Sequence, residues 1–397
     1  MIRFSKASQT MRASAIRELM GLATRRDMVS FAGGMPANNL FPIEEVDEIY
    51  TRLRTGLKQA AFQYGPTSGY PPLVESLKRY FRNRGLSLEG NDVIVTTGGL
   101  QAINLVAKVL VDPRDTVVTE DPTFVGALAA FKSYRADLVG IPLDEDGIRM
   151  PLLENAWKRL RSKPKLLYAI PNFHNPAGIF YSRGRRMHLL QFLKNRRAVL
   201  LEDDAYHELY FDESDRESIL PMKALAAESL PICYVGSFSK IFGPGMRLGW
   251  LLAPREILER CELAKQSFDA CSPTFTQVLA DVFFREGFLE RYLARIRPLY
   301  RRRAETMLTS LAKHMPEGVA WTKPKGGFYI WVTLPRNVDA SDVLKTTLER
   351  GAVFVVGKTF DPRGKKNHCL RLAFSHTPEE DIDRGVKIVA DAIRMSA

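Results

Sequence analysis

The stretch Ile232-Cys233-Tyr234-Val235-Gly236-Ser237 decides the fold class of this chain. Its first four residues form a continuous apolar run, without the apolar and polar alternation of a half-exposed strand. A short run of this kind is typical of a strand that is buried on both faces of a mostly parallel sheet. The stretch therefore predicts a buried strand that ends on small and polar residues.

Four earlier stretches have the same character and the same kind of ending. The runs are Val93–Val95, Thr116–Val118, Leu166–Ile170 and Ala198–Leu201. They lead into Thr96-Thr97-Gly98-Gly99, Thr119-Glu120-Asp121-Pro122, Pro171-Asn172 and Glu202-Asp203-Asp204, respectively. Open α/β sheets bind ligands beyond the carboxyl ends of their strands. These endings therefore predict one composite site at a single edge of the sheet.

The segments between the runs have the periodicity of helices. After Leu100, one helical face collects Ile103, Val106, Ala107 and Leu110. Strands that alternate with helices are typical of an α/β domain. We therefore predict a doubly wound, mostly parallel central sheet.

The pattern changes after about residue 288. A long helical segment over residues 288–314 carries Pro298 and many arginines. The expected elements that follow are a strand at 327–332, a helix at 340–350, strands at 353–355 and 369–373, and a helix from Glu379. They predict a smaller α+β domain. We expect an N-terminal arm over residues 1–41 that packs with this domain and the site, a large ligand-binding domain over 42–290, and the small domain over 291–397.

Length and composition exclude several classes of protein. The 397 residues suggest about two or three domains. Apolar residues make up 45% and charged residues 26%, which excludes a disordered chain, a collagen-like repeat and a coiled coil. No apolar run reaches the length of a membrane span. The four cysteines are scattered without a Cys-x-x-Cys pair, which indicates reduced thiols, no metal site and a cytoplasmic location.

The formal net charge of +12 raises the question of an anionic partner. Arginine clusters at residues 183–186 and 301–303 lie in or beside helical stretches that also carry acids. We expect these clusters on solvated helix faces and not in a nucleic-acid groove, since no nucleic-acid-binding motif accompanies them. The basic N-terminus lacks the apolar core of a secretory signal. A transit peptide is an alternative to the packed arm.

The segment from Gly236 to Gly249 carries the sharpest chemical signal. Lys240 follows the buried strand between hydroxyl side chains, and Arg247 comes seven residues later. A partly buried lysine can have a lowered pKa and form a Schiff base with a carbonyl compound. A serine and an arginine can hold a phosphate. On this segment alone, a surface lysine in a glycine-rich turn is an equal alternative. The glycine spacing does not match a dinucleotide fingerprint.

This segment resembles the lysine signature of the class I and II aminotransferases, which use pyridoxal phosphate on the type I fold. Three further motifs in the family's order extend the resemblance from about Phe31 to Ser375. They are Asn172-Phe173-His174-Asn175-Pro176-Ala177-Gly178, Glu202-Asp203-Asp204-Ala205-Tyr206 and Leu370-Arg371-Leu372-Ala373-Phe374-Ser375. The segment Phe31-Ala32-Gly33-Gly34-Met35-Pro36 is similar to that of the 2-aminoadipate, kynurenine and aromatic aminotransferase subgroup.

The resemblance implies roles for the catalytic residues. Lys240 would bind pyridoxal phosphate covalently and later move a proton between the substrate Cα and the cofactor carbon C4′. Asp203 would pair with the pyridine nitrogen, because the family places this aspartate three residues before the tyrosine, here Tyr206. Asn175 and Tyr206 would hydrogen-bond the phenolic oxygen of the cofactor. Phe124 would stack on its ring, where the family often has tyrosine.

The resemblance also implies how the phosphate and the substrate are held. The phosphate would lie on Gly98, Gly99 and Leu100, at a helix N-terminus, together with Ser237 and Arg247. Relatives often have a Ser-Gln pair at positions 99 and 100, so here the backbone must supply most donors. Tyr64 would reach the phosphate in the partner subunit of a homodimer.

Four residues are implied on the substrate side. Arg371 would bind the α-carboxylate in a bidentate pair, with Asn175 and Gly34 beside it. Arg17 lies in a Ser-x-Ile-Arg element at residues 14–17 and would meet the distal end of the substrate. The alternative for Arg17 is a helix-face arginine that is paired with a nearby acid.

The implied activity is transamination with two half-reactions in a ping-pong cycle. An amino acid with a 2-aminoadipate, aromatic or long aliphatic side chain would give its amino group to a 2-oxo acid, expected to be 2-oxoglutarate. We expect no nucleic-acid or membrane partner. One alternative is a lyase or decarboxylase on the same scaffold. Another is a regulator that senses an effector with this fold, although the roughly 30 residues before the Phe31 motif are too few for a winged helix.

Overall fold

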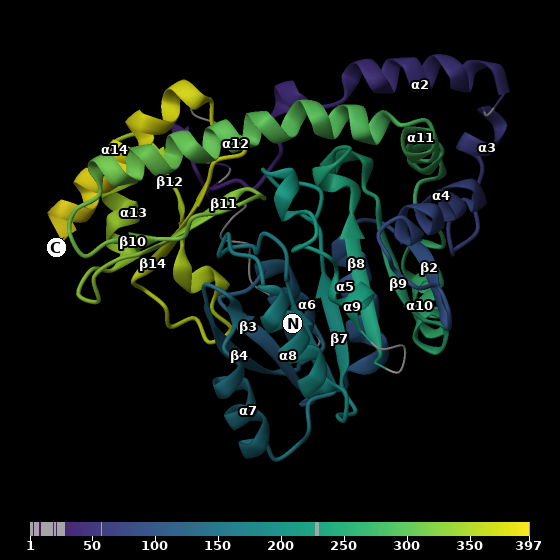
Figure 1. The fold of residues 1–397 in the computed structure, drawn as a ribbon, viewed down its shortest axis with the longest axis horizontal. Coiled ribbons are helices and arrows are strands. Elements are labelled where there is room, and N and C mark those ends of the chain that lie inside the picture. The colour runs from purple at the N-terminus through teal and green to yellow at the C-terminus, as the bar shows by residue number, and fades with distance from the viewer. Residues whose placement is uncertain are drawn as a thin grey trace.

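The computed structural model describes residues 3, 8, 19, 21, 28–56, 58–226 and 230–396. Its centre is an eight-stranded sheet with the order β2-β9-β8-β7-β6-β3-β4-β5 (Figure 1). The strands are β2 Asn91–Thr96, β3 Thr116–Asp121, β4 Asp137–Asp144, β5 Gly147–Ile148, β6 Leu166–Ala169, β7 Val199–Asp203, β8 Ile232–Ser237 and β9 Gly249–Pro254. All five predicted strands of the large domain are present in this sheet.

The sheet is mostly parallel, as predicted. The strand β9 runs antiparallel to both β2 and β8, and β5 runs antiparallel to β4. The strands β5 and β9 were not predicted from the sequence. The five predicted strands all point the same way, so their carboxyl ends meet at one edge.

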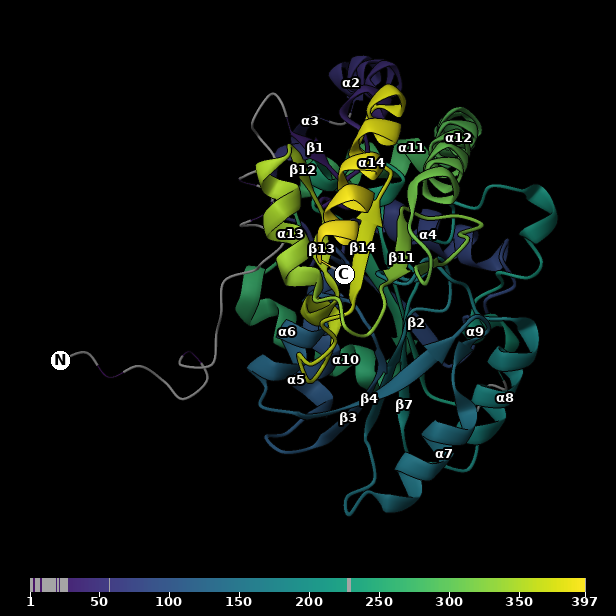
Figure 2. The same ribbon diagram turned by 90° about the vertical axis from the view of Figure 1, so that its left-hand side faces the viewer.

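Helices cover both faces of this sheet, and successive strand residues pack on opposite faces. One layer contains α5 Gly99–Leu110, α6 Val125–Ser133 and α10 Arg255–Asp269; the other contains α7 Met150–Arg159, α8 Arg183–Leu193 and α9 Met222–Leu225. Figure 2 shows the sheet between them. In β7, Leu200 packs with the second layer and Leu201 with the first. Burial on both faces explains why the strands read as continuous apolar runs.

Further helices lie at the β2 end of the sheet. They are α2 Ile43–Gly56, α3 Lys58–Phe62, α4 Pro71–Arg82 and α11 Thr274–Arg285. Of these, α4 packs on β2, and α11 packs against the other three. From α11, the long helix α12 Phe288–His314 runs across to the C-terminal part of the chain (Figure 1). The predicted boundary at residue 290 falls in the first turn of α12. The three-part division of the chain therefore stays a prediction.

A second sheet lies in the C-terminal part, with the order β10-β11-β14-β13. Its strands are β10 Ala320–Trp321, β11 Tyr329–Thr333, β13 Val355–Val356 and β14 Cys369–Ala373; α13 Ala340–Glu349 and α14 Glu379–Ser396 are its neighbouring helices. The strand β1 Val29–Ser30 pairs in parallel with β12 Ala352–Val353. Residues 29–30 of the expected arm therefore contact this part of the molecule.

Two predicted strand boundaries are wrong. The strand expected at 353–355 is two short strands, because the chain leaves the partner β1 at Val353 and joins β14 from Val355. The strand expected from residue 327 begins at Tyr329 instead. Gly327 has a φ of +71°, and a Cβ there would lie 2.7 Å from that of Phe173, so this glycine makes a close turn before the strand.

The expectation that the arginine clusters lie on solvated faces is wrong for Arg186. Its side chain is fully buried on the inner face of α8. The guanidinium donates to the carbonyl oxygens of Tyr181, Pro171 and Leu220 and to Asn172 Oδ1. A buried cation is tolerated here because each of its nitrogens has an oxygen partner.

No helix among the described residues is both long and apolar enough to span a bilayer.

Candidate active site

A cavity of about 460 Å³ opens at the carboxyl ends of the five predicted strands. Each strand end contributes to its lining, as the composite-site prediction requires. The lining residues are Gly34, Met35, Gly98, Gly99, Leu100, Ile103, Phe124, Val125, Gly126, Ile170, Asn175, Asp203, Ala205, Tyr206, Ser237, Ser239, Lys240, Arg247, Tyr329 and Arg371. Among the candidate site residues that the structure describes, all except Tyr64 are in this set.

Lys240 enters the cavity from the short 3-10 turn that follows β8. Its ammonium donates to the Gly34 carbonyl oxygen at 3.0 Å, and Nζ lies 5.6 Å from the ring centroid of Tyr206. Burial, reinforced by the positive charge of Arg371, lowers the pKa of Lys240 to about 8. At pH 7 about a tenth of such amines are neutral, so a nucleophilic lysine is available near neutral pH.

The two adjacent acids at the end of β7 have different surroundings. Asp203 lines the cavity and accepts a hydrogen bond from the Tyr168 hydroxyl at 2.6 Å. Asp204 instead accepts from Asn172 Nδ2 at 2.9 Å and from the Tyr234 hydroxyl at 3.0 Å, outside the set of lining residues. Of the two carboxylates, Asp203 is therefore the one that a ligand in the cavity can meet.

The charge state of these acids follows from their partners. Burial raises the pKa of Asp203 to about 6, although the Tyr168 hydrogen bond opposes this rise. The pKa of Asp204 is lowered despite burial, because His207 and Asn172 stabilise the carboxylate. Asp203 can thus share a proton with a basic partner near neutral pH.

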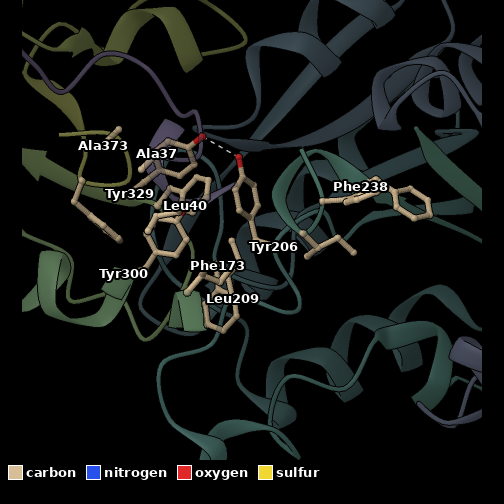
Figure 3. Close-up of a cluster of buried hydrophobic side chains, with 14 of the residues drawn as sticks. Ala37, Leu40, Phe173, Tyr206, Leu209, Phe238, Tyr300, Tyr329 and Ala373 are labelled. Carbon is tan, nitrogen blue, oxygen red and sulfur yellow. Dashed lines mark hydrogen bonds between the residues drawn. The ribbon is translucent and has the colours of Figure 1, made fainter. Parts of the chain in front are cut away.

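A pair of tyrosine hydroxyls lies at the cavity wall. Tyr206 Oη is 2.8 Å from Tyr329 Oη, and either oxygen can be the donor (Figure 3). The two rings meet edge to face with centroids 5.7 Å apart. Burial raises the pKa of both phenols, so both are protonated at neutral pH.

Arg371 reaches the cavity from β14, in the second sheet, and is only 2% exposed. Its guanidinium donates to Asn175 Oδ1 at 2.9 Å and to the Ala32 carbonyl oxygen. Its Nε atom is buried without a hydrogen-bond partner. Within the described part of the chain, no carboxylate forms an ion pair with Arg371. A buried cation of this kind is ready to bind an anionic ligand group.

The turn from Gly98 to Leu100 presents backbone donors at the N-terminus of α5. Gly98 has a φ of +83° and supplies no capping side chain to the helix. The first N–H groups of a helix have no acceptor within the helix, so they are available to an anion. Arg247 lies beside them: a Cβ on Gly98 would be 2.9 Å from its guanidinium.

Close backbone packing holds this turn in place. A Cβ on Gly249 would lie 2.6 Å from the Gly99 nitrogen and 2.8 Å from the Gly236 carbonyl oxygen. Thr97, just before the turn, donates its hydroxyl to Asp269 Oδ2 at 2.6 Å, and Gln101 donates to the same oxygen. Gly99 and Leu100 lack the side-chain hydroxyl and amide that relatives often have at these positions. The turn is nevertheless held in place by contacts outside the cavity.

One predicted residue that the structure describes is not in the cavity. Tyr64 is 85% exposed and does not line it. Arg17 lies outside the described residues.

Sequence reasoning missed Tyr329 and Tyr168. Both stand in apolar strands, where the sequence pattern reads them as core residues. The only signal for Tyr329 is the preceding Gly326-Gly327 pair, since glycines often mark close approach of the chain to a site.

Comparison with known proteins places these features in a family. Residues 28–389 match the family model described as aminotransferase class I and II. The aromatic-amino-acid aminotransferase 1 of Thermococcus litoralis is 38% identical over 395 residues, 98% of this chain and 94% of that protein. The 2-aminoadipate transaminase of Thermus thermophilus is 38% identical over 391 residues, 98% of this chain and 96% of that protein.

A solved structure agrees over nearly the whole chain. The kynurenine aminotransferase of Pyrococcus horikoshii, solved in complex with PMP, KYN and KYA, has a TM-score of 0.95 and 38% identity. The match covers 99% of this chain and 97% of that one.

Proposed function

The chain belongs to the class I and II aminotransferases, and we propose that the cavity around Lys240 is its transamination site. The enzyme is a pyridoxal-phosphate-dependent aminotransferase of fold type I. One observation carries the site proposal: a single cavity holds Lys240, Asp203 and the buried Arg371, which has no acidic partner within the described residues.

The residues present fit pyridoxal phosphate. The free N–H groups at the start of α5, with Arg247 and Ser237 nearby, suit a phosphate. A Cβ on Gly98 would displace the Arg247 guanidinium, so the glycine keeps that cation beside the turn. Lys240 and Asp203 suit the aldehyde and the pyridinium nitrogen, with Phe124 as a wall for the ring.

When bound, pyridoxal phosphate supplies an aldehyde for amines and a ring that accepts the electron pair released at the substrate Cα. Lys240 would hold the aldehyde through its amine, and as a free amine it would move a proton from the substrate Cα to the cofactor carbon C4′. Asp203 keeps a proton on the pyridine nitrogen through its negative charge, and Tyr168 stabilises that charge.

Arg371 and Asn175 orient the substrate. Arg371 binds the α-carboxylate with a forked pair of N–H groups, and Asn175 steadies the guanidinium at 2.9 Å. This contact sets which face of the substrate Cα meets Lys240. Every amino acid and 2-oxo acid carries this carboxylate, so both half-reactions of a ping-pong cycle can use the contact with Arg371.

The amino donors are 2-aminoadipate and amino acids with aromatic or long aliphatic side chains, and 2-oxoglutarate is the acceptor. The names of the relatives at 38% identity support the aromatic and 2-aminoadipate donors. Arg17 is the residue proposed to meet the distal end of the substrate. A guanidinium can pair with a distal carboxylate or cover an aromatic ring with its planar face.

The variant Arg17→Ala tests this side-chain reading. We expect kcat/KM for 2-aminoadipate and glutamate to fall about 10- to 150-fold, because a charge-assisted hydrogen bond is lost. The kcat/KM values for phenylalanine and leucine should fall much less. An equal fall for all donors, or none for any, would contradict a charge-reading role.

The functional unit is a homodimer in which Tyr64 reaches the cavity of the partner subunit. Tyr64 is 85% exposed and lies outside the cavity of its own chain, although it resembles the family's phosphate-binding tyrosine. Phe62, also strongly exposed, lies two residues away. An exposed aromatic pair of this kind suits a symmetric contact between copies.

A cytoplasmic location is part of the proposal. The cysteines Cys233, Cys261, Cys271 and Cys369 are all free thiols. Free thiols persist in a reducing compartment.

The activity itself is tested with purified enzyme, a panel of amino donors and 2-oxoglutarate. Transamination predicts glutamate and the 2-oxo acid of the donor in equal amounts. Glutamate without the matching 2-oxo acid, or release of carbon dioxide, would support a lyase or decarboxylase instead. The variant Arg371→Leu should raise KM for every donor, whereas Arg183→Leu, an exposed arginine of α8, should leave KM unchanged.

A further inference from the structure

Tyr329 contacts three residues of the proposed site. Its hydroxyl lies 2.8 Å from the Tyr206 hydroxyl (Figure 3). Its ring lies under the Arg371 guanidinium, with the carbon Cζ of Arg371 4.4 Å from the ring centroid. A Cβ on Gly34 would be 1.9 Å from its oxygen, so only glycine leaves room for this hydroxyl.

The surroundings favour one tyrosine as the donor of this hydrogen bond. Arg371 lies directly on the face of Tyr329, and a cation next to a phenol makes it a better proton donor. Burial raises the pKa of both phenols, and Arg371 is the main influence that opposes this rise at Tyr329. Although either oxygen can donate at this distance, the position of Arg371 favours the Tyr329 hydroxyl as the donor and Tyr206 Oη as the acceptor.

This direction fixes where the proton of Tyr206 can go. A phenol can donate only one hydrogen bond, and in this arrangement Tyr206 does not donate to Tyr329. Both residues line the cavity, so the Tyr206 O–H can turn toward a ligand there. A hydroxyl that accepts one hydrogen bond also becomes a stronger donor in its own bond.

We propose that Tyr329 is a positioning residue of the aminotransferase, whose hydroxyl donates to Tyr206 and directs the Tyr206 proton to the phenolic oxygen of the cofactor. This inference rests on the proposed site, in which Tyr206 faces that oxygen. A donor to the phenolic oxygen stabilises its negative charge. It thereby favours the deprotonated form of the cofactor–lysine chromophore and lowers the pKa of its visible band.

The test is a pH titration of the visible absorption of the holoenzyme, without substrate. Tyr329→Phe removes the hydroxyl but keeps the ring under Arg371. We expect the proton affinity of the chromophore to rise about 2- to 10-fold, as for loss of one net hydrogen bond. The KM for an amino donor should change less than about 2-fold, because Arg371 keeps its ring contact.

Two variants make this result specific. Tyr300→Phe removes another buried hydroxyl from the same aromatic cluster, outside the cavity lining, and should leave the titration unchanged. Tyr206→Phe should raise the proton affinity more than Tyr329→Phe does. In the Tyr206→Phe background, Tyr329→Phe should add nothing, because its effect passes through Tyr206.

The outcomes separate this inference from the site proposal. If Tyr206→Phe shifts the titration and Tyr329→Phe does not, the positioning role is refuted and the site stands. Additive shifts in the double variant also refute it, because Tyr329 then acts without Tyr206. If Tyr206→Phe itself shifts nothing, Tyr206 does not face the chromophore and the site proposal is wrong at that residue.

Discussion

At the residue scale, the site places a lysine where its charge is unfavourable. Burial lowers the pKa of Lys240 from 10.5 to about 8, so between these values the folded protein binds fewer protons than the unfolded chain. The stability of the cofactor-free enzyme therefore rises with pH across this window. Below about pH 8, the charged amine opposes folding.

The variant Lys240→Met removes that opposition without shortening the side chain much. We expect it to stabilise the cofactor-free protein at pH 7 by at most about 3 kcal/mol, less after solvent screening in the open cavity. The gain should vanish near pH 10.5, where the wild-type amine is neutral. Thermal melts at both pH values measure it. An equal gain at both would show that the charge of Lys240 is not the cause.

The site residues differ in how well the sequence predicts them. Lys240 and Arg371 stand in motifs that resemble those of the aminotransferase family, so the resemblance singles them out before the structure is known. The choice of Asp203 over Asp204 needed a spacing to Tyr206, and the cavity contains Asp203. Tyr329 was missed because its role depends on a contact across 123 positions of sequence, which no local pattern encodes.

At the element scale, Arg186 holds the loop that carries Asn175. Its guanidinium bonds to the Pro171 carbonyl oxygen and to Asn172 Oδ1 at 2.7 Å. Arg186→Met should lower the free energy of unfolding by about 3–5 kcal/mol, because buried oxygens lose a charged donor. The exposed Arg183→Met, on the same helix, should change it by less than about 0.5 kcal/mol. Urea unfolding compares the two, and similar losses would contradict this role.

The contact between β9 and the turn before α5 requires a glycine. Gly249→Ala would place a Cβ 2.6 Å from the Gly99 nitrogen, a rigid backbone atom. We expect a loss of about 1–3 kcal/mol or more and weaker cofactor binding. Gly184→Ala, in α8 with no atom within 4 Å of its Cβ, should stabilise by up to about 1 kcal/mol. Thermal melts and cofactor titrations of both variants measure this. Unchanged cofactor affinity in Gly249→Ala would contradict the packing argument.

The sequence predicts elements better than their pairing. Strands buried on both faces give continuous apolar runs, and all five predicted runs lie in the large sheet. The strand β9 was not predicted, although it occupies the place between β2 and β8. Its antiparallel direction follows from the path of the chain after Lys240, which only tertiary contacts determine. Likewise, the division of residues 352–356 between β12 and β13 depends on which partner lies alongside.

At the scale of the whole molecule, the homodimer proposal predicts complementation between damaged subunits. Tyr64→Ala and Lys240→Ala enzymes should each be impaired. After subunit exchange, each mixed dimer has one intact site, made from Lys240 of one subunit and Tyr64 of the other. Random exchange would then restore about a quarter of the wild-type sites. Activity equal to the mean of the separate variants, or an active monomer in sedimentation, would contradict the shared site.

Whether Lys240 carries the cofactor can be decided by a labelling experiment. Lys223 is a natural comparator, since burial lowers its pKa to about 8 as well, yet it bonds to Asn91 Oδ1 and the Ile232 carbonyl oxygen outside the cavity lining. The holoenzyme is reduced with borohydride, digested and mapped by mass spectrometry. We expect a phosphopyridoxyl group on the peptide that contains Lys240, and none on the peptide that contains Lys223. Label on Lys223 or another lysine, with Lys240 unmodified, would contradict it.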